Sequence, residues 1–204
     1  MPRQLVDATR EQALKILKRT ESALSFPKLL VSTQGETTAG GRDRAFVYQL
    51  VMGTLRHRGA LDWAINQKCS TPVGDLSSWI RNILRMGLYQ ILYLDRVPKS
   101  AAVNESVKLA KKYGHSGTAG LVNAVLRNLH REEVLQALEL LPEEKAPELA
   151  VKYSHPEWMV EMLMQERGLE QTIRILTNNN RIPPQSARAN LLRIDRQRLL
   201  DRLE

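Results

Sequence analysis

Apolar residues recur at helical spacing along most of the chain, and the pattern is most regular over residues 79–94. In this stretch, WIRNILRMGLYQILYL, apolar positions follow the order i, i+3, i+4, i+7, i+8 and i+11. That spacing gathers them on one face and predicts the central helix of a bundle. Gly87 lies in the apolar face, where glycine costs a helix about 1 kcal/mol relative to alanine. We therefore expect another helix to cross close to Gly87.

Weaker forms of the pattern predict further helices on both sides. Asp43 and Asp62 are each expected to cap the start of a helix, because aspartate accepts hydrogen bonds from the free N–H groups of a first turn. Pro98 and Ser100 are expected to open another helix, which ends before Gly114. No strand pattern precedes residue 184, so the first domain is predicted to be an all-α bundle. The other predicted helices lie over residues 4–19, 43–58 and 120–129.

The helix predicted for GLVNAVLRNL, residues 120–129, has a polar side that a helix built only for a core would not need. Five apolar residues share one face, while Asn123 and Arg127, four positions apart, lie together on the opposite face. An amide and a guanidinium are therefore offered on one surface. The alternative for Asn123 is a hydrogen bond to a neighbouring loop, since a buried amide needs partners.

The pattern changes after residue 141, where PEEKAPE forms a proline-containing acidic link. KYSHPEWMVEMLMQERG then predicts a turn and an amphipathic helix, and His155 is expected to make a structural hydrogen bond. Pro183 and Pro184 exclude a helix at their positions, and residues 187–192 are expected to be extended. The sequence therefore divides into a helical domain (residues 1–140), a helical connector (141–182) and a third segment (183–204).

The net charge of +8 comes entirely from the first 140 residues. They hold 20 Lys and Arg against 12 Asp and Glu, whereas the remainder holds 10 against 10. A polyanion is expected to bind where positive charge is in excess. The alternative is that these are the solvated cations of ordinary surface helices.

The sequence offers little for catalysis. GGRDR at residues 40–44 matches neither the Walker nor the dinucleotide pattern, and no GxSxG or HExxH motif occurs. Cys69 is the only cysteine and the four histidines are scattered, so neither a disulfide nor a metal site is expected. The chain opens without an apolar signal region, and no run reaches the roughly 18 apolar residues of a membrane span. We expect a cytoplasmic binding module with no membrane contact.

Three segments resemble, in order, the NusB-like domain at the front of bacterial ribosomal RNA cytosine-C5 methyltransferases of the RsmB (Sun or Fmu) family. They are DRAFVYQLVMGTLRHRGALDWAI, LRMGLYQILYLDRVP and AAVNESVKLAKKYGHSGTAGLVNAVLRN. The resemblance continues through KYSHPEWMVE and NNNRIPPQSARAN, which are similar to the connector and to the opening of that family's RNA-recognition subdomain. That continuation distinguishes the chain from free-standing NusB, an antitermination factor that ends after its bundle.

The resemblance implies a NusB-like helical bundle, a helical connector and the start of a small α/β RNA-recognition subdomain. It implies small-subunit ribosomal RNA and a downstream catalytic domain as partners. The family's S-adenosylmethionine site and catalytic cysteines lie downstream of the matched region, so no cofactor is expected in this chain and the chain alone is predicted to be inactive. Two alternatives stay open: a non-enzymatic RNA and protein adaptor in transcription antitermination, and a scaffold that packs on a catalytic domain.

Candidate RNA-binding residues come from the basic positions of the predicted helices and from the last segment. Arg188 and Asn190 match the family's RxN element, and Tyr89, next in line after Arg81 and Arg85, is a possible stacking ring. The full candidate set is Arg3, Lys15, Arg42, Arg44, Arg56, Arg58, Arg81, Arg85, Arg127, Arg181, Arg188 and Asn190.

Overall fold

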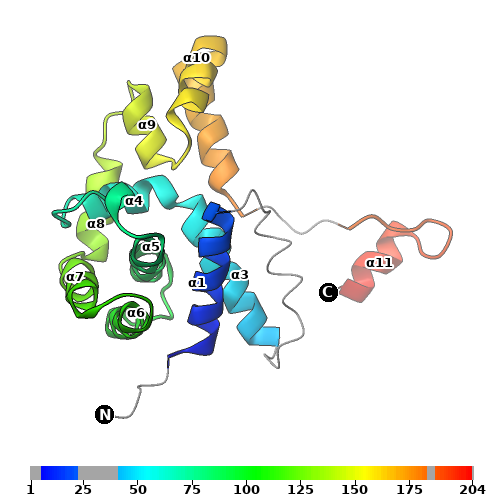
Figure 1. Ribbon diagram of the computed structural model, residues 1–204. Helices are drawn as coiled ribbons and strands as arrows, with labels where there is room; N and C mark the ends of the chain where they lie inside the picture. Colours follow the sequence, from blue (N-terminus) through cyan, green and yellow to red (C-terminus); the bar gives the residue numbers. More distant parts are fainter. Residues whose placement is uncertain (1–5, 23–40, 183–186, 204) are drawn as a thin grey trace.

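The computed structural model describes residues 6–22, 41–182 and 187–203, and within these ranges the chain is helical with no strand (Figure 1). The all-α fold class predicted from the sequence is confirmed. The helices are α1 (Ala8–Ser22), α3 (Gly41–Arg56), α4 (Arg58–Asn66), the short 3₁₀ helix η1 (Val73–Asp75), α5 (Ser78–Tyr93), α6 (Lys99–Tyr113), α7 (Ser116–Arg127), α8 (Arg131–Glu139), α9 (Ala146–Lys152), α10 (Glu157–Asn180) and α11 (Arg196–Leu203).

Helix α5 is the centre of the bundle, as the pattern over residues 79–94 predicted. The Ser77 hydroxyl caps it by accepting from the Ile80 N–H, and every residue from Asn82 to Leu92 is buried. Helices α1, α3, α4, α6, α7 and α8 all pack against it. Each fully buried leucine or isoleucine of such a core contributes about 1.5–3 kcal/mol, and α5 alone carries five of them: Ile80, Ile83, Leu84, Leu88 and Leu92.

Gly87 lies where α6 and α7 cross α5. A Cβ added there would lie 2.6 Å from the Ser106 Oγ of α6 and 2.7 Å from the Leu126 Cδ1 of α7. The predicted close crossing is confirmed. Only a residue without a side chain lets both neighbouring helices approach α5 to this distance.

Two predicted helix starts were wrong. Asp43 lies within the first turn of α3 rather than before it, and Asp62 lies in the second turn of α4, because that helix begins at Arg58. The Asp62 carboxylate is instead directed to Arg85 of α5, with oxygen to nitrogen distances of 2.6 and 2.7 Å. A long-range ion pair therefore replaces the local cap. The predicted end of α6 before Gly114 is confirmed.

A second, smaller core lies beyond the bundle, between α9 and α10. Its buried residues are Ala146, Leu149, Ala150, Val160 and Leu176. The sequence predicted the helix after PEEKAPE but not that this part of the chain has a core of its own.

Helix α10 doubles back on itself at Gly168, whose φ of 74° and ψ of 170° are open essentially to glycine alone. Its far end returns to its start, where the Asn180 amide donates to the Tyr153 carbonyl at 2.7 Å. The predicted structural role of His155 is confirmed by bonds of its two ring nitrogens to the Tyr153 carbonyl (2.7 Å) and the Asn179 amide (3.4 Å).

The last described segment lies apart from the bundle (Figure 1). Residues 187–190 have no regular secondary structure and residues 191–193 form a turn before α11. The first part of the predicted extended run is therefore non-helical, but it does not pair as a strand. Pro183 and Pro184 lie outside the described residues. Among the helices of the described ranges, none is both long enough and apolar enough to cross a bilayer.

Candidate nucleic-acid interface

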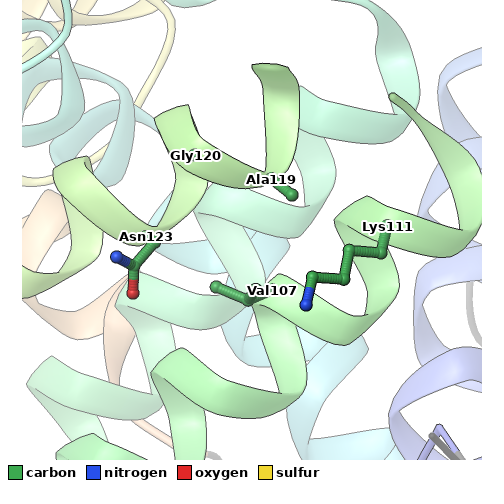
Figure 2. A pocket seen from close by; sticks show the side chains of 5 residues that line it. All are labelled: Val107, Lys111, Ala119, Gly120 and Asn123. Atoms are coloured by element: carbon green, nitrogen blue, oxygen red, sulfur yellow. The ribbon is translucent and has the colours of Figure 1, made fainter. Parts of the chain in front are cut away.

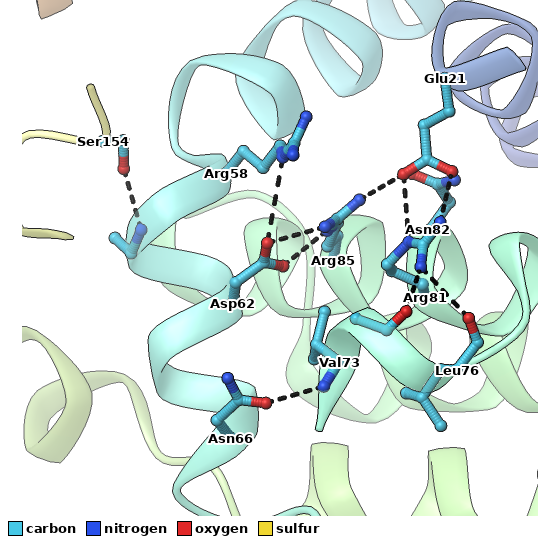
Figure 3. A network of polar contacts seen from close by, with 12 residues as sticks. Glu21, Arg58, Asp62, Asn66, Val73, Leu76, Arg81, Asn82, Arg85 and Ser154 are labelled. Carbon is cyan, nitrogen blue, oxygen red and sulfur yellow. Dashed lines mark hydrogen bonds and ion pairs between the residues drawn. The ribbon is translucent and has the colours of Figure 1, made fainter. Parts of the chain in front are cut away.

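Arg85 does not lie on a surface, which overturns its assignment as an RNA contact. Its side chain is 5% exposed, and its guanidinium donates to both Asp62 oxygens and to Glu21 Oε1 at 2.6 Å (Figure 3). A guanidinium that is buried and paired with two carboxylates is not accessible to a phosphate. The arrangement joins α1, α4 and α5 and is structural.

Arg81 belongs to the same network, with its side chain 21% exposed. Its guanidinium donates to both Glu21 oxygens at 3.2 Å and to the carbonyls of Gly74 and Leu76 (Figure 3). Burial raises the pKa of Glu21, but hydrogen bonds from Arg81 and Ser78 and the charge of Arg85 outweigh burial and hold that pKa at about 2. Glu21 therefore stays ionised and keeps both arginines occupied.

Tyr89 is also unavailable for stacking on a base. The ring is 6% exposed and lies against Gly53, where an added Cβ would be 2.0 Å from Tyr89 Cζ. His57 stacks on Tyr93 with ring centroids 4.0 Å apart. Burial and, after it, the charge of Arg56 lower the pKa of His57 to about 4, so this ring is a neutral packing element.

The basic residues near α1 and α3 lie on the surface of the described part of the chain. Lys15 is half-exposed and pairs with Glu11 at 3.1 Å. Arg42 and Arg44 are exposed in the first turn of α3. Arg3 lies outside the described residues.

Arg56 and Arg58 flank the junction of α3 and α4. Arg56 is half-buried, and Arg58 is 60% exposed at 3.9 Å from the Asp62 carboxylate. Such an exposed pair contributes little to stability, so Arg58 remains available to an anion.

Asn123 and Arg127 lie on one face of α7, as the helical wheel predicted, and that face borders a pocket. The pocket has a volume of about 610 Å³ and opens between α6 and α7 (Figure 2). Arg127 is exposed, and the predicted loop contact of the Asn123 amide does not occur among the described residues. The lining residues are Val107, Lys111, Ala119, Gly120 and Asn123.

Lys111 was missed in the sequence, although its position carried a signal. It stands four residues after Val107 on α6, so the two side chains lie on the same face of that helix. The sequence pattern assigned no role to that face. In Figure 2, Val107 lies between the Lys111 ammonium and the Asn123 amide. The structure therefore joins the polar face of α7 to a cation on α6.

Arg181, Arg188 and Asn190 are exposed near the end of the chain. The Asn190 side-chain oxygen accepts from the Leu192 N–H at 3.1 Å, which forms a local turn and leaves the amide N–H₂ free to donate. Arg188 and Asn190 stand two residues apart in a segment with no regular secondary structure.

Metal and thiol chemistry find no site in the part of the chain that the structure describes. No group of three or more His, Cys, Asp or Glu side chains is placed to hold a metal ion among those residues. Cys69 is buried in the main core, where a thiol is an apolar filler. The described surface presents cations and amides.

A comparison with protein-family models gives the class of protein. The NusB family model matches residues 7–131, more than half of the chain, and the chain belongs to the NusB family. A second model, the RsmF/B-like methyltransferase ferredoxin-like domain, matches residues 155–204. This match begins at the start of α10, within the segment that the sequence pattern assigned to a connector.

Two curated proteins that are similar to the chain carry the same name. The probable ribosomal RNA small subunit methyltransferase B of Bacillus subtilis is 34% identical over 199 residues, which is 96% of this chain and 43% of that protein. Its namesake from Synechocystis is 39% identical over 154 residues, 76% of this chain and 34% of that protein. The chain therefore spans less than half the length of these curated relatives.

Solved structures share the fold of the bundle. NusB in the crystal structure of antitermination factors NusB and NusE with dsRNA has a TM-score of 0.54 and 22% identity, covering 63% of this chain and 94% of that one. A T. maritima NusB structure has a TM-score of 0.56 and 18% identity, covering 65% of this chain and 99% of that one. The expected NusB-like bundle is confirmed.

Proposed function

We propose that this chain is the RNA-binding and targeting region of an S-adenosylmethionine-dependent methyltransferase that modifies cytosine C5 in small-subunit ribosomal RNA. The observation that carries the proposal is the order of two regions in one chain, a NusB-family bundle followed by an RsmF/B-like ferredoxin-like region. The Bacillus subtilis protein named probable ribosomal RNA small subunit methyltransferase B matches over 199 residues, which includes both regions.

The physical need for such a region comes from the reaction. A cytosine in folded RNA must leave its stack before a thiolate attacks it, so the enzyme must first be placed on the RNA. A basic bundle supplies salt-dependent attraction, for which Arg42, Arg44, Arg58 and Arg127 are exposed. Arg188 and the last segment are proposed to set the register.

Chemistry is assigned to a downstream catalytic domain. Cys69 is the only cysteine of this chain and is buried, so no thiol here reaches a base. The chain also lacks a glycine-rich donor-binding motif. We expect the purified chain to transfer no methyl group and to show no saturable binding of S-adenosylmethionine. Methyl transfer by the purified chain would overturn this part of the proposal.

The second candidate is a non-enzymatic adaptor in transcription antitermination, which the likeness to NusB favours. An adaptor of that kind needs only the bundle, whereas this chain continues through a region that matches methyltransferases. The reading frame separates the two: a donor-binding motif and two cysteines downstream of residue 204 belong to the methyltransferase alone.

RNA binding itself is tested by titrating a small-subunit ribosomal RNA fragment at several salt concentrations. Affinity is expected to fall steeply, with a log–log slope on the order of 0.7 to 0.9 per phosphate neutralised. Changing Arg188 and Asn190 to Ala is expected to weaken binding of the small-subunit ribosomal RNA fragment more than binding of an unrelated hairpin. The matched control changes Arg174 and Asn178 of α10, which are also exposed. Equal losses for both fragments, or equal losses in the control, would refute the register role.

A further inference from the structure

We propose that the groove between α6 and α7 binds a single-stranded stretch of about three RNA nucleotides. The phosphates would lie on Lys111 and Arg127, and a base edge on Asn123. The inference rests on the proposed function and names where within the bundle the RNA is held. The pocket is lined by Val107 and Lys111 of α6 and by Gly120 and Asn123 of α7, and Asn104 and Arg127 continue the same two helix faces beyond it.

The two helices run antiparallel with matching faces. The Lys99 ammonium at the start of α6 donates to the Arg127 carbonyl at the end of α7, at 2.9 Å. On both helices the groove residues follow i, i+3 and i+7, which keeps them on one side of each helix. Lys111 therefore lies at one end of the groove and Arg127 at the other.

The two groove cations differ from their neighbours on α6. Lys108 pairs with Glu105, and Lys112 pairs with Glu11, each at 2.7 Å. Lys111 and Arg127 are exposed, and no carboxylate pairs with either side chain among the described residues. An anion from outside the chain is the partner that these two positions lack.

The shape of the groove suits a strand rather than a compact ligand. A Cβ added at Gly120 would meet no atom within 4 Å, so the floor is open there. Arg127 stands seven residues beyond Gly120, about 10 Å along the helix axis. A stacked strand rises about 3.4 Å per nucleotide and covers that distance in about three nucleotides.

The amide of Asn123 favours RNA over an acidic peptide. It offers a donor and an acceptor side by side, the pattern found on the edge of a nucleobase. The carboxylates of an acidic peptide offer acceptors alone, so only the peptide backbone could donate to the amide oxygen. An unpaired strand leaves the pairing edges of its bases free, so a stacked run of unpaired bases still presents both groups to a protein surface.

The test measures binding of a labelled single-stranded oligoadenylate to the full chain at several salt concentrations. Lys111→Gln with Arg127→Gln is expected to make the salt slope shallower by about 1.4, since each single-strand phosphate contributes about 0.7. The matched control is Lys145→Gln with Arg174→Gln, which removes the same charge from exposed positions outside the groove. The control is expected to leave the slope unchanged.

A neutral variant tests the groove by shape. Gly120→Leu places its Cβ where no atom lies within 4 Å and narrows the floor, so the chain is expected to stay folded while binding oligoadenylate about two- to tenfold more weakly, the worth of one hydrogen bond. Ala137→Leu adds the same side chain at an exposed position of α8 and is expected to change neither.

The outcomes separate the inference from the proposed function. If the unaltered chain binds no RNA, both fail. If it binds RNA and the groove variants behave like their controls, the inference alone is overturned. An acidic peptide that displaces oligoadenylate from the parent chain but not from the double glutamine variant would assign the groove to a protein partner instead.

Discussion

Replacing Arg85 with Ala is expected to destabilise the bundle and to leave RNA binding unchanged. The substitution removes three charge-assisted hydrogen bonds, two to Asp62 and one to Glu21, from a side chain that is 5% exposed. Glu21 keeps Arg81 as a partner, but Asp62 keeps only the exposed Arg58 at 3.9 Å. The main cost is therefore one poorly compensated carboxylate.

Breaking a buried ion pair from one side costs about 3–5 kcal/mol. The Glu21 and Asp62 side chains are 17% and 25% exposed, so water offsets part of that cost and the lower end, about 3 kcal/mol, applies. For a protein of this size the melting temperature falls about 2–4 °C per kcal/mol, which predicts a decrease of about 6–12 °C.

Thermal melting, monitored by circular dichroism, measures the loss of stability. Titration with ribosomal RNA, at a temperature where the variant is folded, measures RNA binding. Arg174→Ala, on the exposed side of α10, is the control and is expected to stay within about 0.5 kcal/mol of the parent. Adding Asp62→Ala to the Arg85 variant is expected to recover part of the loss, because the stranded carboxylate is gone. A variant that melts like the parent but loses affinity for RNA would refute the reasoning.

Three further outcomes are expected. The pKa of His57 is about 4 against an ordinary 6.5, so the folded state favours the neutral ring, and stability should be full above pH 6.5 and decline towards pH 4. His57→Phe should flatten this decline, which denaturant unfolding at a series of pH values measures. Gly87→Ala should cost about 1–3 kcal/mol by overpacking against Ser106 and Leu126, while the control Gly120→Ala should gain up to about 1 kcal/mol, and equal melting temperatures would contradict this. A chain ending at Leu141 should still melt cooperatively, because that residue packs on the main core and the α9–α10 core lies beyond it; a broad, non-cooperative transition would show that the two cores fold as one.

Local pattern was enough to predict α5, its glycine crossing and the all-α class. Each depends on side chains within a few turns of one another, and periodicity reports on that range. The prediction for Asn123 and Arg127 held for the same reason, because the helical wheel fixes which face a residue occupies.

The assignment of Arg85 failed because its partners are distant in sequence. Arg81 and Arg85 stand beside an apolar stripe in a way that resembles a solvated basic edge. Glu21 is 64 residues before Arg85 and Asp62 is 23 before it, and only the packing of α1 and α4 on α5 brings the charges together. The sequence shows which acidic residues are present but not which basic residues they pair with.

Helix α10 leaves and rejoins the molecule at one place. The amides of Asn179 and Asn180 meet His155 and Tyr153, so the two ends of the hairpin are held side by side while Gly168 forms its tip. A change in the length of the hairpin at Gly168 would therefore extend or shorten a protrusion without moving the residues that follow. Insertions are tolerated best at exposed tips of this kind, so the position of Asn180 relative to Tyr153 does not depend on how long the hairpin is.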